Sequence, residues 1–520
     1  MLSLWSLIIN SSNNPIIFIL IFTCMIFRTY GLTSEGRGGH MTAIVKDQIY
    51  FMGGSRKIPD GDPIKSSIRG YNLSNEVFSL DLTTQFSTVN PPYVVLSGTS
   101  QMIYGSEKGY AVVGGPSKQD VYLVGGALQN FTLLNQIDHN VTIVSNQTLM
   151  INELYNTWNV SDQNIFIYRP STKSWLSPGS VAKGGPTIRR RSTSTVIDHE
   201  GRIIYIFGGR AEKDTGSLTF TCFNDLYIYD TTVSRWNKIN AANAPSPRSH
   251  STATLLPNGK ILYIGGVSQD SPGEDAWPID MTNISVFNTN TWTWSYMIAK
   301  SSTPIQARTG HTATLTPDNN KIIIIGGSTS YVLGLTTAYP MFLSLDITKE
   351  PYEYSELSFS GIKPPPLSFH TVNLYQNYMI VAFGNITNDG QTGTTETNPN
   401  IYLLDLPCQS WVTVFKPGES SCPKPPPPAL IIGLTIACYA LFLAAIVVVK
   451  LSKRLSLTNN FIIFVTIACS VLLIVGIITD TILISPSQQI VNVIIGVTVA
   501  FFFIFMVVMC CWCAGKKKTV

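Results

Sequence analysis

The residues that could carry out chemistry in this chain of 520 residues are its histidines, cysteines and carboxylates. Four of the six histidines stand 13 to 15 residues before a glycine-containing strand end, which is a repeated structural position: His40, His250, His311 and His370. The sequence contains no nucleophile elbow, no His-Glu-x-x-His motif and no cysteine pair at metal-binding spacing. We therefore predict that the chain is not an enzyme and has no catalytic residues, cofactor or bound metal.

One acidic loop and the three cysteines outside the terminal apolar segments and the tail remain as candidates for chemistry. The loop contains Asp270, Glu274, Asp275, Trp277 and Asp280, and it could bind Ca²⁺ or a cationic partner, or simply be a solvated connection between strands. Cys222, Cys408 and Cys422 allow three pairings. We favour Cys408 with Cys422, since that bridge closes a short loop worth about 3 kcal/mol, and we expect Cys222 to be a buried free thiol.

Apolar segments at both ends indicate a secretory membrane protein. Residues 1–31 contain the 12-residue apolar stretch Ile16 to Phe27, which is too short to span a bilayer and is typical of a signal peptide. Cleavage before Leu32 and retention as an uncleaved anchor both stay open. Three longer apolar segments predict transmembrane helices at residues 429–449, 461–484 and 490–512.

Charge predicts how these helices are oriented. The loop 450–460 and the tail 513–520 each contain three Lys or Arg residues, which favour the cytoplasmic side. Residues 32–428 are then non-cytoplasmic, with the proline-rich stalk 417–428 next to the membrane. The boundary cysteines Cys510, Cys511 and Cys513 are palmitoylation candidates or inert thiols. The tail lysines Lys517 and Lys518 are either an endoplasmic-reticulum retrieval sequence or plain membrane anchoring.

Glycosylation acceptors agree with this orientation. Seven N-x-[ST] sequences lie between the apolar ends, and none lies in the predicted membrane region: Asn72, Asn130, Asn140, Asn146, Asn159, Asn283 and Asn385. Four of them fall within residues 127–164, which interrupt the repeat described next. We therefore predict that residues 127–164 form an exposed, glycosylated insertion.

The middle of the chain repeats at intervals of about 60 residues. Strand-like runs end in paired glycines, with Gly384-Asn385 as a degenerate sixth pair: Gly53-Gly54, Gly114-Gly115, Gly208-Gly209, Gly265-Gly266 and Gly326-Gly327. Each pair follows a His or Ser, with Ser100 and Ser194 completing the histidine series. A tryptophan closes four repeats, seven residues after an aromatic residue or Leu: Trp175, Trp236, Trp294 and Trp411.

These offsets resemble the kelch repeat over about 375 residues, from Arg37 to Trp411. The resemblance, to kelch proteins of the galactose oxidase superfamily and to fungal-type kelch proteins with C-terminal transmembrane segments, implies an all-β propeller over residues 32–416. Six blades are the direct count, or seven because Gly125-Gly126 offers a further strand end. A three-helix transmembrane segment would follow the propeller.

The resemblance also implies an alternative function, that of a copper-radical oxidase of the galactose oxidase type. That copper site needs two His and two Tyr ligands, one Tyr being cross-linked to Cys. The repeated position already uses four histidines and leaves only His139 and His199, so the sequence lacks the ligand set.

We instead predict a membrane-anchored recognition or adhesion protein that binds a protein or glycan on the non-cytoplasmic side. The expected location is the plasma membrane, or the endoplasmic reticulum if the tail lysines act in retrieval. Candidate contact loops are Ser268 to Asp280, Ser328 to Thr337 and Lys213 to Phe223. An alternative is a lumenal scaffold for trafficking or complex assembly that acts through its transmembrane helices. The net charge of +4 is small and concentrated at the membrane segments, so we expect no nucleic-acid partner.

Overall fold

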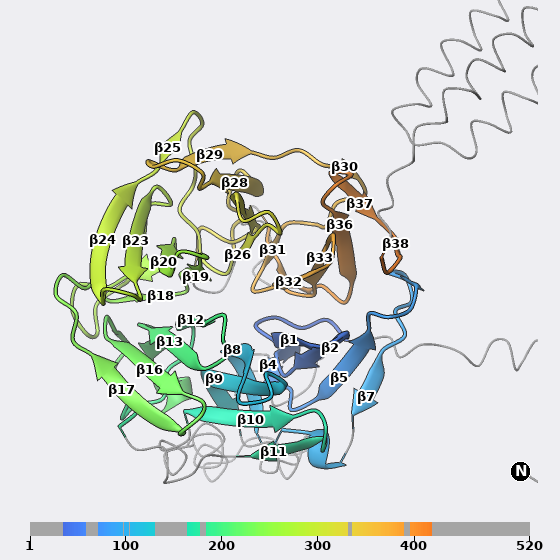
Figure 1. The fold of residues 1–520 in the computed structure, drawn as a ribbon, viewed down its shortest axis with the longest axis horizontal. Coiled ribbons are helices and arrows are strands. Elements are labelled where there is room, and N and C mark those ends of the chain that lie inside the picture. The colour runs from blue at the N-terminus through green and yellow to red at the C-terminus, as the bar shows by residue number, and fades with distance from the viewer. Residues whose placement is uncertain are drawn as a thin grey trace, which may run out of the picture. The chain divides into compact units, whose positions relative to one another are not determined.

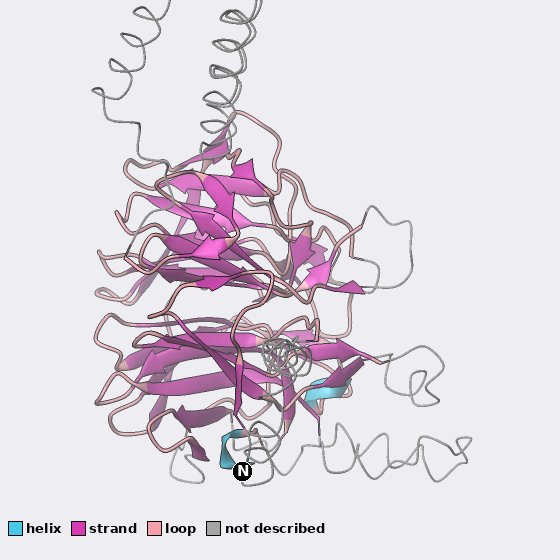
Figure 2. Ribbon diagram, turned by 90° about the vertical axis from the view of Figure 1, so that its right-hand side faces the viewer, coloured by secondary structure: helices cyan, strands magenta, loops and turns pink. Residues whose placement is uncertain are grey.

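The computed structural model describes residues 35–58, 71–96, 98–102, 104–129, 164–176, 184–330, 335–388 and 396–418. These residues form strands and connecting loops, with only short 3₁₀ turns such as η2 (Gly98–Ser100) and η5 (Lys213–Thr215) (Figure 2). The strands assemble into a ring of small antiparallel sheets (Figure 1). The fold is therefore an all-β propeller.

Six sheets of four or five strands are the blades of the described chain, and each uses one continuous stretch of sequence. The first three blades are β1 (Met41–Val45), β2 (Gln48–Met52), β5 (Val77–Asp81) and β7 (Val94–Leu96); β8 (Gly105–Gly114), β9 (Asp120–Gln129), β10 (Ile165–Arg169) and β11 (Ser174–Leu176); and β12 (Ser194–Ile197), β13 (Ile203–Phe207), β16 (Leu226–Asp230) and β17 (Arg235–Ile239).

The last three blades are β19 (Thr252–Leu255), β20 (Lys260–Ile264), β23 (Asn283–Asn288) and β24 (Thr293–Ile298); β26 (Thr312–Leu315), β27 (Lys321–Ile325), β28 (Phe342–Asp346) and β29 (Glu353–Glu356); and β32 (Thr371–Tyr375), β33 (Tyr378–Ala382), β36 (Ile401–Asp405) and β37 (Ser410–Val412). Two short strands, β25 (Lys300–Ser301) and β30 (Ser360–Gly361), add in parallel to the outer edges of blades 5 and 6. The first strands of successive blades pack side by side around the axis.

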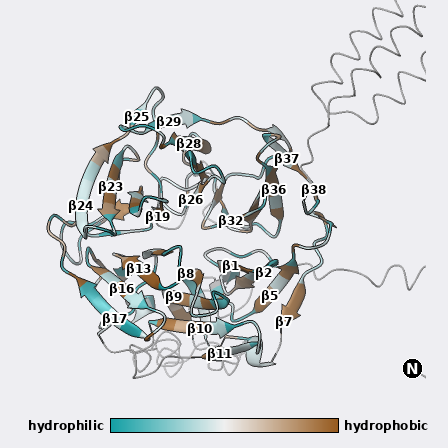
Figure 3. Cartoon of the chain, in the orientation of Figure 1, coloured by the Kyte–Doolittle hydropathy of each residue, from teal (hydrophilic) through white to brown (hydrophobic). Residues whose placement is uncertain are grey.

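The core lies between the blades. Six clusters of buried apolar side chains each join two neighbouring blades of the described chain. Alternate residues of one strand serve opposite neighbours, since Ile261 and Tyr263 of β20 pack toward blade 3 whereas Leu262 and Ile264 pack toward blade 5. Both faces of these strands are buried, so their sequences are continuously apolar. The outer strand β17 is hydrophilic by comparison (Figure 3).

The tryptophans of the repeat lie on the fourth strand of four blades. Trp175, Trp236, Trp294 and Trp411 pair directly across from Tyr168, Tyr229, Phe287 and Leu404 on the third strand. All except Trp175 are buried, and the Trp175 indole N–H donates to the Ser100 carbonyl at 2.8 Å. The seven-residue offset in the sequence is therefore the length of a hairpin that places two large side chains opposite each other.

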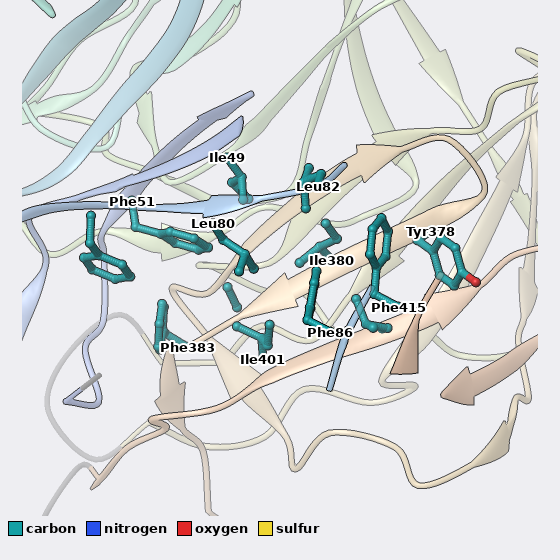
Figure 4. Close-up of a cluster of buried hydrophobic side chains, with 13 residues drawn as sticks. Ile49, Phe51, Leu80, Leu82, Phe86, Tyr378, Ile380, Phe383, Ile401 and Phe415 are labelled. Carbon is teal, nitrogen blue, oxygen red and sulfur yellow. The ribbon is translucent and has the colours of Figure 1, made fainter. Parts of the chain in front are cut away.

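The ring closes between blades 6 and 1. Figure 4 shows Phe51 and Leu80 of blade 1 facing Ile380 and Phe383 of blade 6 in one apolar cluster. At the outer end of this seam, β6 (Phe86–Ser87) pairs with β38 (Val414–Phe415), and the rings of Phe86 and Phe415 stack at 4.8 Å. The closure is thus a packed interface with one short two-stranded sheet, and within the described residues each blade is built from one stretch of the chain.

Candidate functional site

The connection from the second to the third strand leaves every described blade at the same end of the ring, which we call the insert face. Four small sheets form at this end of the ring: β3 (Ser55–Lys57) with β4 (Tyr71–Leu73); β14 (Arg210–Ala211) with β15 (Thr221–Cys222); β18 (Arg248–Ser249), β21 (Val267–Ser268) and β22 (Trp277–Pro278); and β31 (Leu367–Ser368), β34 (Asn385–Ile386) and β35 (Glu396–Thr397). In the last two sheets, β18 and β31 come just before the innermost strand of the blade, and the other strands lie within its connection. The insert face therefore carries the most variable part of each blade on a repeated scaffold.

A repeated pair of left-handed residues starts each of these connections. The pairs are Gly53-Gly54, Gly125-Gly126, Gly208-Gly209, Gly265-Gly266, Gly326-Gly327 and Phe383-Gly384, with φ between 52° and 101°. The second member donates its N–H to a carbonyl of the next blade at 2.7–2.9 Å, as Gly266 does to Arg308. At Gly209 an added Cβ would lie 2.5 Å from Thr193 Cγ2, so glycine is needed for the close approach as well as for φ.

These pairs correct two predictions from the sequence. In blade 2 the repeated position belongs to Gly125-Gly126, whereas Gly114 ends β8 and Gly115 lies in the β8–β9 turn. In blade 6 it belongs to Phe383-Gly384 and not to Gly384-Asn385. Because Gly125-Gly126 serves blade 2 itself, it gives no seventh blade within the described residues.

A second ring of left-handed residues surrounds the axis, one from each blade. They are Gly39, Lys108, Ser192, His250, Gly310 and Phe369, with φ between 53° and 63°. Backbone hydrogen bonds of 2.7–3.0 Å join five of the six neighbouring pairs, including Lys108 to Gly39, Ser192 to Lys108 and Phe369 to Gly310. The ring closes across the seam as well, since the Gly39 N–H donates to the Phe369 carbonyl at 2.8 Å.

Large side chains project from this second ring over the axis. The Lys108 ammonium lies 4.6 Å from the centre of the Phe369 ring, and the His250 ring meets Phe369 edge-on at 5.6 Å. All three residues line a central cavity of about 250 Å³ that continues along the innermost strands, where Thr252, Thr312 and other threonines line it. The insert-face end of the channel is therefore occupied by side chains and stiffened by the backbone ring.

Three histidines hold neighbouring blades together beside this cavity. Their Nε2 atoms lie within hydrogen-bonding distance of threonine hydroxyls on the preceding blade: His311 with Thr252 at 3.4 Å, His370 with Thr312 at 3.2 Å, and His40 with Thr371 at 2.8 Å. Burial lowers the pKa of His311 and of His370 to about 3. Neutral rings between blades are interface residues, and no group of three or more potential metal ligands occurs among the described residues.

Strand register places these histidines and corrects the predicted repeat by one residue. His40, His311 and His370 each precede the first residue of the innermost strand. Thr193 and Ser251 hold that place in blades 3 and 4, so Ser194 and His250 do not. In blade 2 the equivalent residue is Gly109, because Tyr110 pairs with Val124 just before the glycine pair, and Ser100 lies in η2.

A buried charge cluster, not predicted from the sequence, joins blades 2 and 3 at the insert face. The Arg191 guanidinium is 5% exposed and forms ion pairs with Glu107 at 3.1 Å, with Asp214 at 3.2 Å and with Glu212. Arg210 Nε also contacts Glu212 at 2.7 Å. These residues are far apart in the chain, and only the run of three arginines at 189–191 marks the place in the sequence.

The carboxylates of this cluster differ in their pKa. Burial alone would raise the pKa of Glu212, but the charges of Arg191 and Arg210 outweigh it and lower the pKa to about 2. Burial raises the pKa of Asp214, and repulsion from Glu212 and Glu107 opposes the attraction of Arg191 there. The cluster therefore keeps Glu212 ionised and fixes the connection of blade 3 to blade 2.

The three predicted contact loops all lie in insert-face connections, in blades 3, 4 and 5. The blade 3 and blade 4 loops touch, because the Gly273 N–H donates to the Phe220 carbonyl at 2.8 Å. The blade 5 loop reaches blade 6, where the hydroxyls of Thr337 and Thr387 are 2.8 Å apart. The described connections of blades 3 and 4 are thus in contact, as are those of blades 5 and 6.

The predicted modification and disulfide residues fall partly within the described chain. Asn283 is exposed at the start of β23, whereas Asn72 and Asn385 are half-buried in β4 and β34. Cys222 is a buried free thiol, and Cys408 is disulfide-bonded. The other glycosylation and palmitoylation candidates and Cys422 lie outside the described residues, so the pairing of Cys408 with Cys422 stays a prediction.

The predicted membrane segments also lie outside the described residues, as do residues 1–31 and most of the insertion 127–164. Within the described ranges from 35 to 418, no helix has the length and apolar character needed to cross a bilayer.

Several known proteins are similar to this chain. Kelch domain-containing protein 1 of Homo sapiens is 31% identical over 181 residues, which are 34% of this chain and 39% of that protein. Acyl-CoA-binding domain-containing protein 4 of Arabidopsis thaliana is 24% identical over 48% of this chain and 34% of its own length. The solved structure of YjhT covers 61% of this chain and 84% of its own, with a TM-score of 0.41 and 18% identity.

The chain therefore spans about a third to two fifths of the length of these curated relatives. A family model, the Attractin/LZTR1 β-propeller, matches residues 155–424, which are 270 of the 520 residues. The matched region contains the four repeated tryptophans and the histidine–threonine pairs of blades 4 to 6. Together with the kelch-type ring of blades, this match shows that the chain belongs to the Attractin/LZTR1 β-propeller family.

Proposed function

We propose that this chain is a membrane-anchored recognition protein that binds a macromolecular partner, a protein or a glycan, through its insert face. The kelch propeller is a general protein-binding scaffold. The observation that carries the proposal is the insert face itself, where connections of different sequence are joined across blades on a closed ring. Rigid scaffolds that present variable loops are well suited to recognition, since little conformational freedom is lost on binding.

Membrane anchoring and the non-cytoplasmic orientation belong to the same proposal. They are supported by three long apolar segments, by the cations between and after them, and by seven glycosylation acceptors on the other side. A propeller displayed in this way would bind a partner in the extracellular space or in an organelle lumen. The alternative in which the membrane segments hold the activity depends on residues outside the described chain.

Site-specific photo-crosslinking of the full chain in cells tests this proposal. A photoreactive amino acid is placed at the exposed insert-face positions Glu274 and Tyr339, and at Asn258 and Asn319, which are exposed in the β19–β20 and β26–β27 turns at the opposite end of the ring. We expect a specific crosslinked partner from the insert-face positions alone. Crosslinks only from Asn258 or Asn319, or none from any position, would refute recognition through the insert face.

A further inference from the structure

The insert connections of blades 3 and 4 meet at residues 217–220 and 270–277, which we call the blade 3–4 ridge. Leu218 is 92% exposed, and Trp277 is 43% exposed on β22. Exposed apolar side chains surrounded by polar residues commonly mark a protein interaction site when they form a patch. The contact between the loops is direct, because a Cβ added to Gly273 would lie 3.7 Å from Thr219 Cγ2.

Hydrogen bonds of buried side chains fix the backbone of the ridge. Gln269 is 2% exposed, and its side chain accepts from the Cys222 N–H at 2.7 Å and donates to the carbonyls of Phe220 and Glu274 at 3.2 and 2.8 Å. One buried amide thus joins both loops. Thr215, also buried, closes the start of the blade 3 loop through two hydrogen bonds with Glu212. Leu218 is therefore presented on a fixed backbone.

The charge of the ridge is uniformly negative on the blade 4 side. Residues 267–282 contain Asp270, Glu274, Asp275 and Asp280, and they contain no Lys or Arg. All four carboxylates are exposed, and Asp270 accepts a hydrogen bond of 3.4 Å from the Trp277 indole. The one cation between residues 249 and 299, Lys260, lies at the start of β20 at the opposite end of the blade, where it binds Glu350.

From these features we propose that the blade 3–4 ridge binds a protein segment that presents Lys or Arg side chains around an apolar contact. Leu218 and Trp277 supply the buried centre of the interface, as exposed tryptophans commonly do. The acidic rim attracts the cations, speeds association and excludes acidic partners. This inference rests on the proposed function and narrows it to one part of the insert face and one partner chemistry. A protein is favoured over a glycan, since Leu218 has no polar group to offer a sugar and four carboxylates without a neighbouring Lys or Arg favour a cationic partner.

The test uses a phage library of random 12-residue peptides panned against the immobilised full chain. We expect the enriched peptides to carry net positive charge together with an aromatic or aliphatic residue. Trp277→Ser and Leu218→Ser should each weaken binding of these peptides about tenfold or more. Val233→Ser, which removes an exposed apolar side chain from the β16–β17 turn, should leave binding unchanged.

The charge contribution is measured separately. Glu274→Gln with Asp275→Asn should weaken binding about threefold or more, and raising NaCl from about 0.1 M to about 0.5 M should weaken the wild type more than this variant. The matched control is Glu353→Gln with Glu356→Gln, which neutralises two exposed carboxylates of β29. Equal far-ultraviolet circular dichroism shows that each variant is folded.

Each other outcome overturns the inference. The inference is wrong if the enriched peptides are neutral or acidic, or if they bind the Trp277→Ser variant equally well. It is also wrong if the chain binds a glycan array in a way that needs Trp277 but not the carboxylates. If the ridge variants behave as wild type while Tyr339 still crosslinks a partner, the ridge is wrong and recognition by the insert face stands. If no insert-face position crosslinks a partner, the proposed function fails as well.

Discussion

Acidification should destabilise the propeller through the histidines that lie between its blades. His311 and His370 have a pKa of about 3 in the folded chain, first because they are buried and, for His311, also because the charge of Arg308 is near. In the unfolded chain both return to about 6.5. The unfolded chain therefore binds more protons as the pH falls below that value, and the equilibrium shifts toward unfolding.

The magnitude follows from proton linkage. Between about pH 7.5 and about pH 5.5, each such histidine removes about 1.4 kcal/mol from the free energy of unfolding, so His311 and His370 together remove about 3 kcal/mol. His40 and His250 act in the same direction, since burial and neighbouring cations hold the pKa of each well below its ordinary value. Glu212 contributes nothing in this window, because its stabilisation is lost only as the pH falls below about 4.5.

The assay is urea unfolding of the full chain followed by tryptophan fluorescence at the two pH values. His370→Gln is expected to lower stability at both, but to reduce the loss between them by about 1.4 kcal/mol. His199→Gln, in the exposed β12–β13 turn, is the matched control and should leave the difference unchanged. If the His370→Gln chain shows the same pH dependence as the wild type, then His370 is not held neutral between the blades and the reasoning is refuted.

Three further predictions concern single side chains. Phe383→Ala should lower the free energy of unfolding by about 3–5 kcal/mol, because the Phe383 ring lies in the seam cluster. Phe383→Gly should be about 1 kcal/mol more stable than Phe383→Ala, because φ at this position is 52°. An equal or reversed order of the two variants in urea unfolding would contradict this. Arg308→Met should cost about 3 kcal/mol or more by leaving the carbonyls it binds in blade 5 unpaired, whereas Arg235→Met, on the exposed edge of β17, should be nearly neutral in the same assay. Burial raises the pKa of the Cys222 thiol, so mass spectrometry after iodoacetamide should find Cys222 labelled only in the unfolded chain, and rapid labelling of the folded chain would disprove its burial.

The propeller and its blades could be predicted from the sequence because they depend on local spacing. A hairpin of fixed length sets the distance from Tyr229 to Trp236, and the glycine pair marks each place where a blade meets the next. The prediction was wrong where another residue fills the repeated position. Phe383 takes a left-handed conformation that glycine takes in the other blades, and its ring packs edge-on against Phe51 at 5.5 Å, which compensates for the strain.

The candidate site was less accessible to sequence reasoning. The ion pairs of Arg191 join residues 84 and 21 positions away in the chain, and the hydrogen bond between Gln269 and Cys222 spans 47 positions. No local pattern encodes such contacts, because they depend on the register of two neighbouring sheets. The loops themselves were predicted as contacts, but the exposure of Leu218, which decides where on the insert face binding is centred, appears only when the loops are folded.

The seam between blades 6 and 1 has a kinetic consequence. Every other junction joins blades that follow each other in the chain, whereas the contacts of His40 with Thr371 and of Asp47 with Tyr375 connect residues 331 and 328 positions apart. Bringing such distant ends together costs about 5 kcal/mol of chain entropy. Blades can thus stack in order as they are synthesised, and the circle stays open until the last one is complete. A partner that binds blades 6 and 1 at the same time would slow the opening of the ring.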